Sequence, residues 1–477
     1  MLYFAGKGGK RMEGNVGPTV DSGRKACHAS VCSFSLLFAY VLSFFFEGEA
    51  FYSLTEGSLW GSETLLFASV ISHLAGLLLG FMFVKDLVHA KRAMTLTGAA
   101  SLLLTLPFFF EQTLLWLPLI AAIGFLCGIS VASWGWFLRI CAQQLGGLRV
   151  CADVLIYSNL VMTAANTATL HVSGKAGLAI AVAALALSVF FALSPAVSGG
   201  DERAPGAYTD VSSPLFFLCL FVATITIDSG LMYQVFNPAF ESLSWLASWY
   251  WAVPYMAALV VMRFLPVGAH RAKFLYLGIA MIILSFVCFA VAGRGAAGYL
   301  AVDTLMLGAC GIFDLFWWSI AAEMLCCAKN PAKVFGFCLA ANVGGVLTGD
   351  AAGFLLRTFA VSAPNVAVIA LIIVCVTTAL LPPLNVKLLS LLKEHTYLYS
   401  FPQLPRQERE KALDVASEQL SAREREVLGL LTSGLTNRQI AESLCVSENT
   451  VKFHVKNIYS KFEVTSRAGL LAKILKK

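Results

Sequence analysis

"SENTVKFHVKNIYSKF", residues 447–462, is a polar and basic segment near the end of a chain that is otherwise mostly apolar. On a helical wheel of about 100° per residue, Val451, Val455, Ile458 and Phe462 fall on one narrow stripe. Such a stripe predicts an amphipathic helix that packs against other helices. The segment therefore belongs to a small helical domain at the end of the chain.

The opposite side of this predicted helix carries Asn449, Lys452, Phe453, Lys456 and Ser460. Lysine binds phosphates or guanine edges, asparagine pairs with adenine, and an apolar ring contacts the methyl group of thymine. This face is therefore suited to the major groove of DNA. The alternative is an ordinary amphipathic helix with a solvated polar side.

The sequence before this segment contains helix-start signals. Ser421 with Glu424, and Thr436 with Gln439, have the spacing of capping boxes. Ser447 is a good N-cap for the helix that follows a short turn. A helix, a short turn and a second helix form the helix-turn-helix layout, and one further helix is predicted after it.

Residues 420–474, "LSAREREVLGLLTSGLTNRQIAESLCVSENTVKFHVKNIYSKFEVTSRAGLLAKI", closely resemble the LuxR/NarL/FixJ-type DNA-binding domain. The shared elements are L-[ST]-x-R-E-x-E-V-L, G-L-[ST]-N-x-[EQ]-I-A, S-x-x-T-V-K-x-H and the V-x-[ST]-R step before the last helix. Cys445, Phe453 and Phe462 are less usual side chains at their positions. The resemblance implies a four-helix domain over residues 417–477.

The resemblance also implies roles for individual residues. The base-facing residues would be Lys452, Phe453 and Lys456. Thr450 and Asn457 would contact the DNA backbone or a base edge, and Arg438 and Lys461 would be backbone candidates. Asn449, which the helical wheel places on the same face, is a further candidate. Arg423 and Glu424 would be structural. The last helix would form a homodimer contact through Leu470, Leu471 and Ile474, and such dimers bind paired half-sites in promoter DNA.

The rest of the chain has the composition of a membrane protein. The sequence is 58% hydrophobic and 13% charged, with a mean hydropathy of +0.76, whereas about a quarter of an average soluble domain is charged. Twelve apolar runs are about long enough to cross a bilayer, and they must be helices to satisfy their backbone groups in lipid. They lie near residues 27–46, 63–84, 93–110, 114–138, 150–170, 176–194, 214–236, 246–267, 273–292, 297–323, 333–356 and 365–387.

The loops between the runs alternate in charge. One set is basic, and it contains Lys85, Lys91, Arg92, Arg139, Arg149, Arg263, Arg271, Lys273, Lys329 and Lys333. The other set is mainly acidic, and it contains Glu47, Glu49, Glu56, Glu63, Glu111 and Glu241. The positive-inside rule therefore predicts that both termini lie in the cytoplasm. Together with the resemblance of the C-terminal domain, we expect a multi-pass protein of the bacterial plasma membrane.

A polar break at 195–213, "PAVSGGDERAPGAYTDVSS", divides the runs into six and six. This layout resembles the major facilitator superfamily, in which two six-helix bundles are joined by a cytoplasmic loop. The expected fold is all-α, a bundle of about twelve spans followed by the helix-turn-helix domain. The expected parts are a cytoplasmic tail (1–26), two bundles (27–194 and 214–387) with the linker 195–213 between them, a second linker (388–416) and the DNA-binding domain (417–477).

Several polar side chains fall inside the predicted spans, where they are costly and often mark a site. They are Asn159, Asn166, Asp228, Asp303, Asp314, Asn342 and Asp350. Asp228 and Asp314, the latter next to Trp317 and Trp318, are candidates for sensing a cation or an aromatic compound. The alternatives are buried polar links between helices, or acids that lie near the membrane interface. The glycines of "GGVLTGDAAG", residues 344–353, predict close helix packing.

No enzyme motif is evident, so we expect no catalytic activity, no cofactor and no metal site. The first hypothesis is a membrane-bound, one-component transcriptional regulator that senses an unknown small molecule or a membrane signal. The second is a secondary transporter fused to its own DNA-binding regulator, and the third is a DNA-anchoring protein without sensing. The expected partners are double-stranded promoter DNA, membrane lipid and a second copy of the chain.

Overall fold

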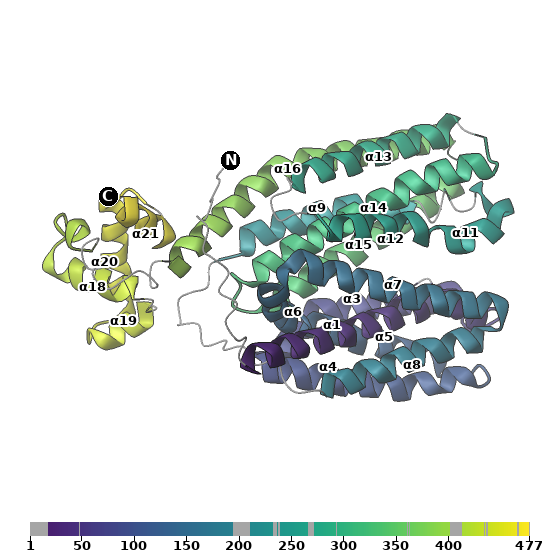
Figure 1. The fold of residues 1–477 in the computed structure, drawn as a ribbon, viewed down its shortest axis with the longest axis horizontal. Coiled ribbons are helices and arrows are strands. Elements are labelled where there is room, and N and C mark those ends of the chain that lie inside the picture. Colours follow the sequence, from purple (N-terminus) through teal and green to yellow (C-terminus); the bar gives the residue numbers. More distant parts are fainter. Residues whose placement is uncertain are drawn as a thin grey trace.

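The computed structural model describes residues 18–46, 48–193, 210–231, 236, 239–265, 271–291, 293–359, 361, 363–400, 413–433, 435, 437–464 and 467–476. Within these ranges the chain is helical and contains no β-strand. Figure 1 shows a long bundle of helices and, at one end of it, a small group of helices that contains the C-terminus. The expected all-α architecture is confirmed.

The first half of the bundle is built from helices that correspond to the first six predicted spans. They are α1 (Pro18–Phe44), α3 (Ser62–Phe83), α4 (Leu87–Thr105), α5 (Trp116–Ser133) with α6 (Gly135–Cys141), α7 (Gly147–His171) and α8 (Gly174–Leu193). The short helix α2 (Glu49–Thr55) follows the first span, and the 3-10 turn η1 (Leu106–Phe109) ends the third.

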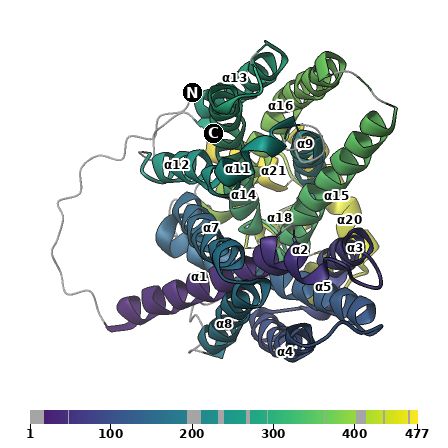
Figure 2. The same ribbon diagram turned by 90° about the vertical axis from the view of Figure 1, so that its right-hand side faces the viewer.

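The second half is built from the remaining spans. Its helices are α9 (Ser212–Leu231), α11 (Ser244–Tyr250) with α12 (Ala252–Arg263), α13 (Arg271–Val291), α14 (Ala296–Leu325), α15 (Pro331–Thr358) and α16 (Ala363–Ser400). A short 3-10 turn, η4 (Glu241–Leu243), precedes α11. Seen along the bundle, helices α9 to α16 group on one side and helices α1 to α8 on the other (Figure 2), which is the expected division into two groups of six.

Eleven helical stretches of the described chain are long and apolar enough to cross a membrane. One of them, Trp116–His171, has 56 residues and contains two of the predicted spans. The π-helical turn η2 (Ala142–Gly146) interrupts it, and Gly146 has a φ of 91°, which a residue with a side chain adopts only at a cost. The chain therefore changes direction between α6 and α7, so this stretch provides two spans.

Close packing of α9 against α15 confirms the prediction made from the glycine-rich segment. A Cβ atom added at Gly345 would collide with the carbonyl oxygen of Ala223, and one added at Gly349 would collide with that of Ile227. The two backbones approach so closely only because these positions lack side chains.

The C-terminal unit contains α18 (Ala422–Thr432), α19 (Asn437–Ser443), α20 (Glu448–Lys461) and α21 (Arg467–Lys476). Its hydrophobic core is separate from that of the membrane bundle. Leu413 and Ala416 also pack in this core, so the folded unit starts a few residues before the expected boundary at 417.

Helix α16 joins the two parts. It packs against α9 and α13 in the bundle and continues as a helix to Ser400, well into the segment 388–416 that was expected to be a linker. It contacts α21 of the C-terminal unit, and Figure 1 shows the end of α16 next to α21.

Candidate functional site

Helix α20 has the two faces that its sequence predicts. Ser447 caps the helix, because its hydroxyl accepts a hydrogen bond from the backbone N–H of Thr450 at 3.1 Å. The stripe of Val451, Val455, Ile458 and Phe462 is buried in the domain core. The packed face fixes the orientation of the helix and leaves the other face outside.

The outer face of α20 presents the predicted DNA contacts. Phe453 is 61% exposed, and Asn449, Thr450, Lys452 and Lys456 are also exposed. Asn457 is half-buried beside them. A shallow groove runs along this face and is lined by Asn437, Lys452, Val455, Lys456, Tyr459, Ser460 and Val464. Basic, amide and aromatic groups are thus gathered on one surface that is open to a large partner.

Two of the predicted contacts are held in surface ion pairs within their own helices. Lys452 pairs with Glu448 at 2.9 Å, and Arg438 pairs with Glu442 at 3.1 Å. Both pairs join residues four positions apart and are solvent-exposed, so each is weak and easily exchanged for a phosphate. The ion pairs set the two cations in place without removing them from the surface.

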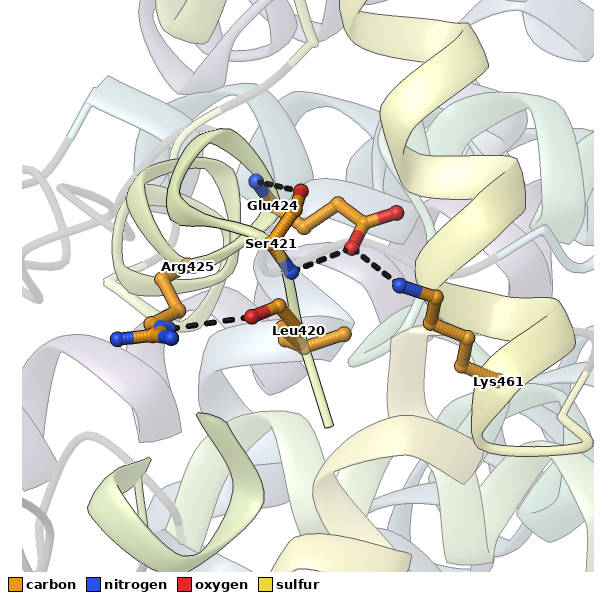
Figure 3. A network of polar contacts seen from close by, with 5 residues as sticks. All are labelled: Leu420, Ser421, Glu424, Arg425 and Lys461. Atoms are coloured by element: carbon orange, nitrogen blue, oxygen red, sulfur yellow. Dashed lines mark hydrogen bonds and ion pairs between the residues drawn. The ribbon is translucent and has the colours of Figure 1, made fainter. Parts of the chain in front are cut away.

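Lys461 has a structural role that its sequence position did not reveal. Its ammonium group donates to Glu424 Oε2 at 2.7 Å, and the same oxygen accepts the backbone N–H of Ser421 at 2.9 Å (Figure 3). Ser421 in turn accepts from the Glu424 N–H, which completes the predicted capping box. Lys461 therefore joins the end of α20 to the start of α18 rather than standing free for DNA.

This network also perturbs the acid at its centre. The Lys461 ammonium and, after it, the groups of Ser421 hold the pKa of Glu424 below its ordinary value, although burial acts against them.

Arg423 is structural as well, since it pairs with Glu426 at 2.6 Å and donates to the carbonyl oxygen of Leu444 at 3.1 Å. The second predicted capping box cannot be placed, because Thr436 lies outside the described residues.

The predicted dimer residues lie inside the domain. Leu470, Leu471 and Ile474 are at most 2% exposed and belong to the hydrophobic core of the C-terminal unit. Their side chains pack against the other helices of the same chain, so in this arrangement they are not presented to a second copy. Periodicity marks α21 as amphipathic, but it does not tell whether the apolar side faces its own domain or a partner.

In the membrane bundle, the structure brings together Asp314 and Trp317 and adds a tyrosine from another helix. Tyr255 on α12 donates its hydroxyl to Asp314 Oδ2 at 2.8 Å, and Trp317 Nε1 donates to Oδ1 at 3.2 Å. Both carboxylate oxygens of Asp314 therefore have protein partners. This arrangement links α12 to α14, as expected of a buried polar link.

Trp318 belongs to a different group, an aromatic cluster between the two halves of the bundle. Its ring centroid lies 5.7 Å from that of Phe38 and 5.3 Å from that of Phe335. Phe34 stacks on Trp134 at 3.9 Å in the same cluster. Trp318 is 1% exposed, so it stabilises the contact between the halves.

Asp228, on α9, is the predicted site residue without partners. It is 2% exposed, and neither of its carboxylate oxygens has a hydrogen-bond partner in the described part of the chain. Asp303 on α14 is 8% exposed, and its Oδ2 atom is also buried without a hydrogen-bond partner in the described part of the chain. A buried polar atom without a partner is costly and calls for an explanation.

An ion pair between the two halves was not predicted. Arg263 at the end of α12 donates Nε to Asp153 Oδ1 at 2.5 Å and Nη2 to Oδ2 at 3.2 Å. Asn330, at the start of α15, makes a separate contact between the halves by donating to the carbonyl oxygens of Phe81 and Val84. The halves are thus joined by side chains far apart in the sequence, which no local pattern reveals.

Comparison with known proteins agrees with the geometry of the C-terminal unit. Residues 418–473 match the family model of bacterial regulatory proteins of the luxR family. The C-terminal unit is a LuxR-type helix-turn-helix domain. The outer face of α20 is the surface of this LuxR-type domain on which the predicted DNA contacts lie.

Relatives of the LuxR-type domain occur in several bacteria. The domain is 53% identical over 55 residues to the "Probable transcriptional regulatory protein SgaR" of Hyphomicrobium methylovorum. The aligned residues make up 12% of this chain and 26% of that protein. It is 47% identical over 57 residues to the transcriptional regulatory protein DegU of Brevibacillus brevis, 12% of this chain and 24% of the relative. The chain spans about a quarter of the length of these two relatives.

The membrane bundle is similar in fold to solved transporters. The human organic anion transporter MFSD10 superposes with a TM-score of 0.58 and 15% identity, over 76% of this chain and 100% of that one. The proton:xylose symporter XylE, of the major facilitator superfamily, superposes with a TM-score of 0.53 and 10% sequence identity. The superposition covers 75% of this chain and 94% of XylE. The bundle N-terminal to the LuxR-type domain therefore has a major-facilitator-like fold.

Proposed function

We propose that this chain is a membrane-bound, one-component transcriptional regulator. Its LuxR-type domain binds promoter DNA, and its major-facilitator-like domain senses a small molecule or a state of the membrane. In this proposal the bundle lies in the bacterial plasma membrane, and the basic loops support a cytoplasmic position of both termini, where DNA is accessible. We propose no enzymatic activity for the chain.

One observation carries this proposal: helix α16 is part of the membrane bundle and also contacts the LuxR-type domain. It packs among the membrane helices, runs without interruption to Ser400 and contacts α21 of the LuxR-type domain. A rearrangement of the bundle that moves α16 would therefore move the DNA-binding domain as well. A sensor with two conformations needs only a ligand that binds one of them more tightly.

The test compares the full chain with a chain that lacks residues 1–395. The short chain retains the separate hydrophobic core of the LuxR-type domain, so it is expected to fold. Promoter occupancy and reporter output are measured for both chains under a range of growth conditions. We expect the full chain to respond to at least one condition and the short chain to respond to none; identical outputs in every condition would refute sensing.

The fold of the bundle also supports a second candidate, a secondary transporter fused to its own regulator. This candidate predicts saturable, gradient-driven uptake of a solute into membrane vesicles that contain the full chain. Vesicles with a chain that lacks residues 401–477 provide the control, because transport would not require the DNA-binding domain.

A further inference from the structure

Two thiols from different helices of the first half are in contact with each other. Cys27 lies near the start of α1, and Cys141 is the last residue of α6. Their thiols are hydrogen-bonded to each other, and the Cys141 sulfur lies 3.9 Å from the Cys27 carbonyl oxygen. The sulfur atoms of a disulfide are about 2.05 Å apart, so these two sulfurs need only a short further approach to form one.

The pair is buried, but an exposed side chain of a π-helical turn covers it. Cys27 and Cys141 are both 0% exposed. The Cys27 thiol donates a hydrogen bond to Gln144 Oε1 at 3.2 Å, and Gln144 itself is exposed. Gln144 belongs to η2, the turn between α6 and α7, and π-helical turns are often found at functional sites. A small polar oxidant therefore reaches the pair when one surface side chain moves.

A second pair of thiols in the described chain lies in apolar surroundings instead. Cys219 of α9 and Cys338 of α15 are also hydrogen-bonded to each other. The sequence around Cys219 is "FFLCLF", residues 216–221, and a thiolate is costly among such side chains. Cys27, in contrast, follows the exposed residues Arg24 and Lys25, and reactive cysteines lie near basic side chains. Of the two pairs, that of α1 and α6 is suited to oxidation.

A chain of hydrogen bonds links this pair to the contact between the halves of the bundle. Cys141 is hydrogen-bonded to the hydroxyl of Ser30, which accepts the indole N–H of Trp134 at 3.1 Å. The Trp134 ring stacks on Phe34 at 3.9 Å and lies 5.7 Å from the ring of Phe335 in the second half. A disulfide removes the thiol hydrogen of Cys141 and draws its sulfur toward α1, so it changes the anchor of Trp134.

We propose that Cys27 and Cys141 form a redox-active pair that hydrogen peroxide oxidises to a disulfide. The Cys27 sulfur attacks one peroxide oxygen and the O–O bond breaks. Cys27 becomes a sulfenic acid, and the departing hydroxide takes up the thiol proton and leaves as water. The Cys141 sulfur then attacks the Cys27 sulfur, the S–S bond forms, the S–O bond breaks, and a second water leaves with the remaining thiol proton. Two thiols lose two electrons, and one peroxide gains them.

The disulfide acts on the tight contact between α6 and the second half. Helix α6 packs against α14 and α15, and a Cβ atom added at Gly135 would lie 2.8 Å from the carbonyl oxygen of Pro331. A shift of α6 toward α1 is therefore not absorbed locally, and it favours conformations of the bundle that accommodate it. This inference rests on the proposed sensor function and names its signal, a peroxide.

The experiment uses the purified full chain in lipid nanodiscs, which is first reduced and then exposed to an excess of hydrogen peroxide. Free thiols are alkylated in denaturant, and the digested chain is analysed by mass spectrometry. We expect a linked peptide that contains Cys27 and Cys141 after the peroxide treatment. Dithiothreitol should remove the link by thiol–disulfide exchange and become oxidised itself.

The variants assign the steps to the two thiols. In Cys141→Ser the reaction should stop at the sulfenic acid, so dimedone should label Cys27. Cys27→Ser should show neither the label at position 27 nor the linked peptide, and either variant decides the outcome if the other does not fold. Cys338→Ser removes one thiol of the apolar pair and is the matched control, which should form the linked peptide as the wild type does. Gln144→Ala uncovers the Cys27 sulfur and should speed formation of the link several-fold.

Two results would overturn the inference: peroxide produces no Cys27–Cys141 peptide from the wild type, or a Cys219–Cys338 peptide forms at least as fast. Peroxide should also change reporter output from the wild type and leave that from Cys27→Ser unchanged, and equal responses would remove the role of the pair as a signal. Failure of the proposed function is distinguishable, because promoter occupancy by the full chain and its response to other growth conditions do not require the disulfide.

Discussion

At the scale of single residues, the proposed DNA-binding surface depends on a few side chains on the outer face of α20. Lys456 is exposed and has no ion-pair partner in the described part of the chain, whereas Lys452 must leave Glu448 to reach DNA. Exchanging a weak surface pair for a phosphate or a guanine edge is favourable, since the surface pair contributes little. We therefore expect both lysines to contribute to binding, and Lys456 to contribute more.

The first prediction concerns these lysines. Lys456→Ala and Lys452→Ala should each weaken specific DNA binding by about 1–3 kcal/mol, because each removes a contact to a base or phosphate. Lys473→Ala, on α21, is the matched control and should change affinity little. Footprinting at fixed salt, together with circular dichroism, checks this, and undiminished footprints in both α20 variants would mean that another face binds DNA.

A second residue-scale prediction follows from the pKa of Glu424. Because the folded-state pKa lies below the ordinary 4.5, the stabilisation by Glu424 is fully present above that pH. It is lost as the pH falls through the depressed value. Glu424→Gln should lower the free energy of unfolding of residues 413–477 by about 1 kcal/mol at neutral pH and flatten its acid dependence.

Urea unfolding of this fragment between about pH 7 and about pH 3 measures the effect. Glu426→Gln is the control, since Glu426 lies on the same helix but is 53% exposed in its pair with Arg423. Equal acid dependence in the two variants would show that the Lys461 network does not stabilise the domain.

At the scale of secondary-structure elements, the sequence predicts what is local. The buried stripe of α20 and the capping box at Ser421 follow from spacing within one turn or two, and both are confirmed. The partner of Lys461 is 37 positions away, so no periodicity identifies it. The polar segment after Lys387 has the composition of a linker, yet backbone hydrogen bonds continue the helix to Ser400.

The candidate site in the membrane shows the same limit. The sequence identifies Asp228 and Asp314 because charged residues are rare in apolar runs. The sequence does not reveal that Asp314 has two hydrogen-bond donors whereas Asp228 has none. These donors come from the way in which α12 and α14 pack against each other. Trp318, although adjacent to Trp317, packs in the aromatic cluster between the halves instead.

The third prediction concerns the ion pair between α7 and α12. Asp153 and Arg263 are 19% and 28% exposed in their side chains, so removing one partner leaves a partly desolvated charge. Asp153→Asn or Arg263→Gln should destabilise the full chain by about 1–3 kcal/mol. The exchange Asp153→Arg with Arg263→Asp should recover part of that loss.

A double-mutant cycle of thermal unfolding isolates the pair. An interaction free energy near zero would show that the ion pair does not hold the halves together.

At the scale of the whole molecule, two separate hydrophobic cores are joined by one helix. Each half of the bundle packs mainly on itself, and the halves meet where α15 packs against α3 and where α12 and α14 pack against α7. The aromatic cluster and the Asp153–Arg263 pair are among these contacts. Helix α16 belongs to the second half, and it contains Pro382 and Pro383, which remove backbone hydrogen bonds and weaken the helix there. Helix α16 contacts the LuxR-type domain, so we expect movement between the halves to reach that domain through α16.

The last prediction tests this transmission without knowledge of the signal. Arg263→Gln loosens the contact between the halves and should change reporter output from the full chain, because it shifts the balance between conformations of the bundle. Inserting two glycines after Lys387 should make α16 flexible and leave DNA binding by the LuxR-type domain intact. In the chain with the insertion, Arg263→Gln should no longer change the output, since the two domains then move independently. Reporter output and promoter occupancy are measured for the wild type, Arg263→Gln, the glycine insertion and the combination of the two. An insertion of two alanines, which keeps the helix, is the control. An undiminished effect of Arg263→Gln after the glycine insertion would show that the bundle acts on the DNA-binding domain by another route.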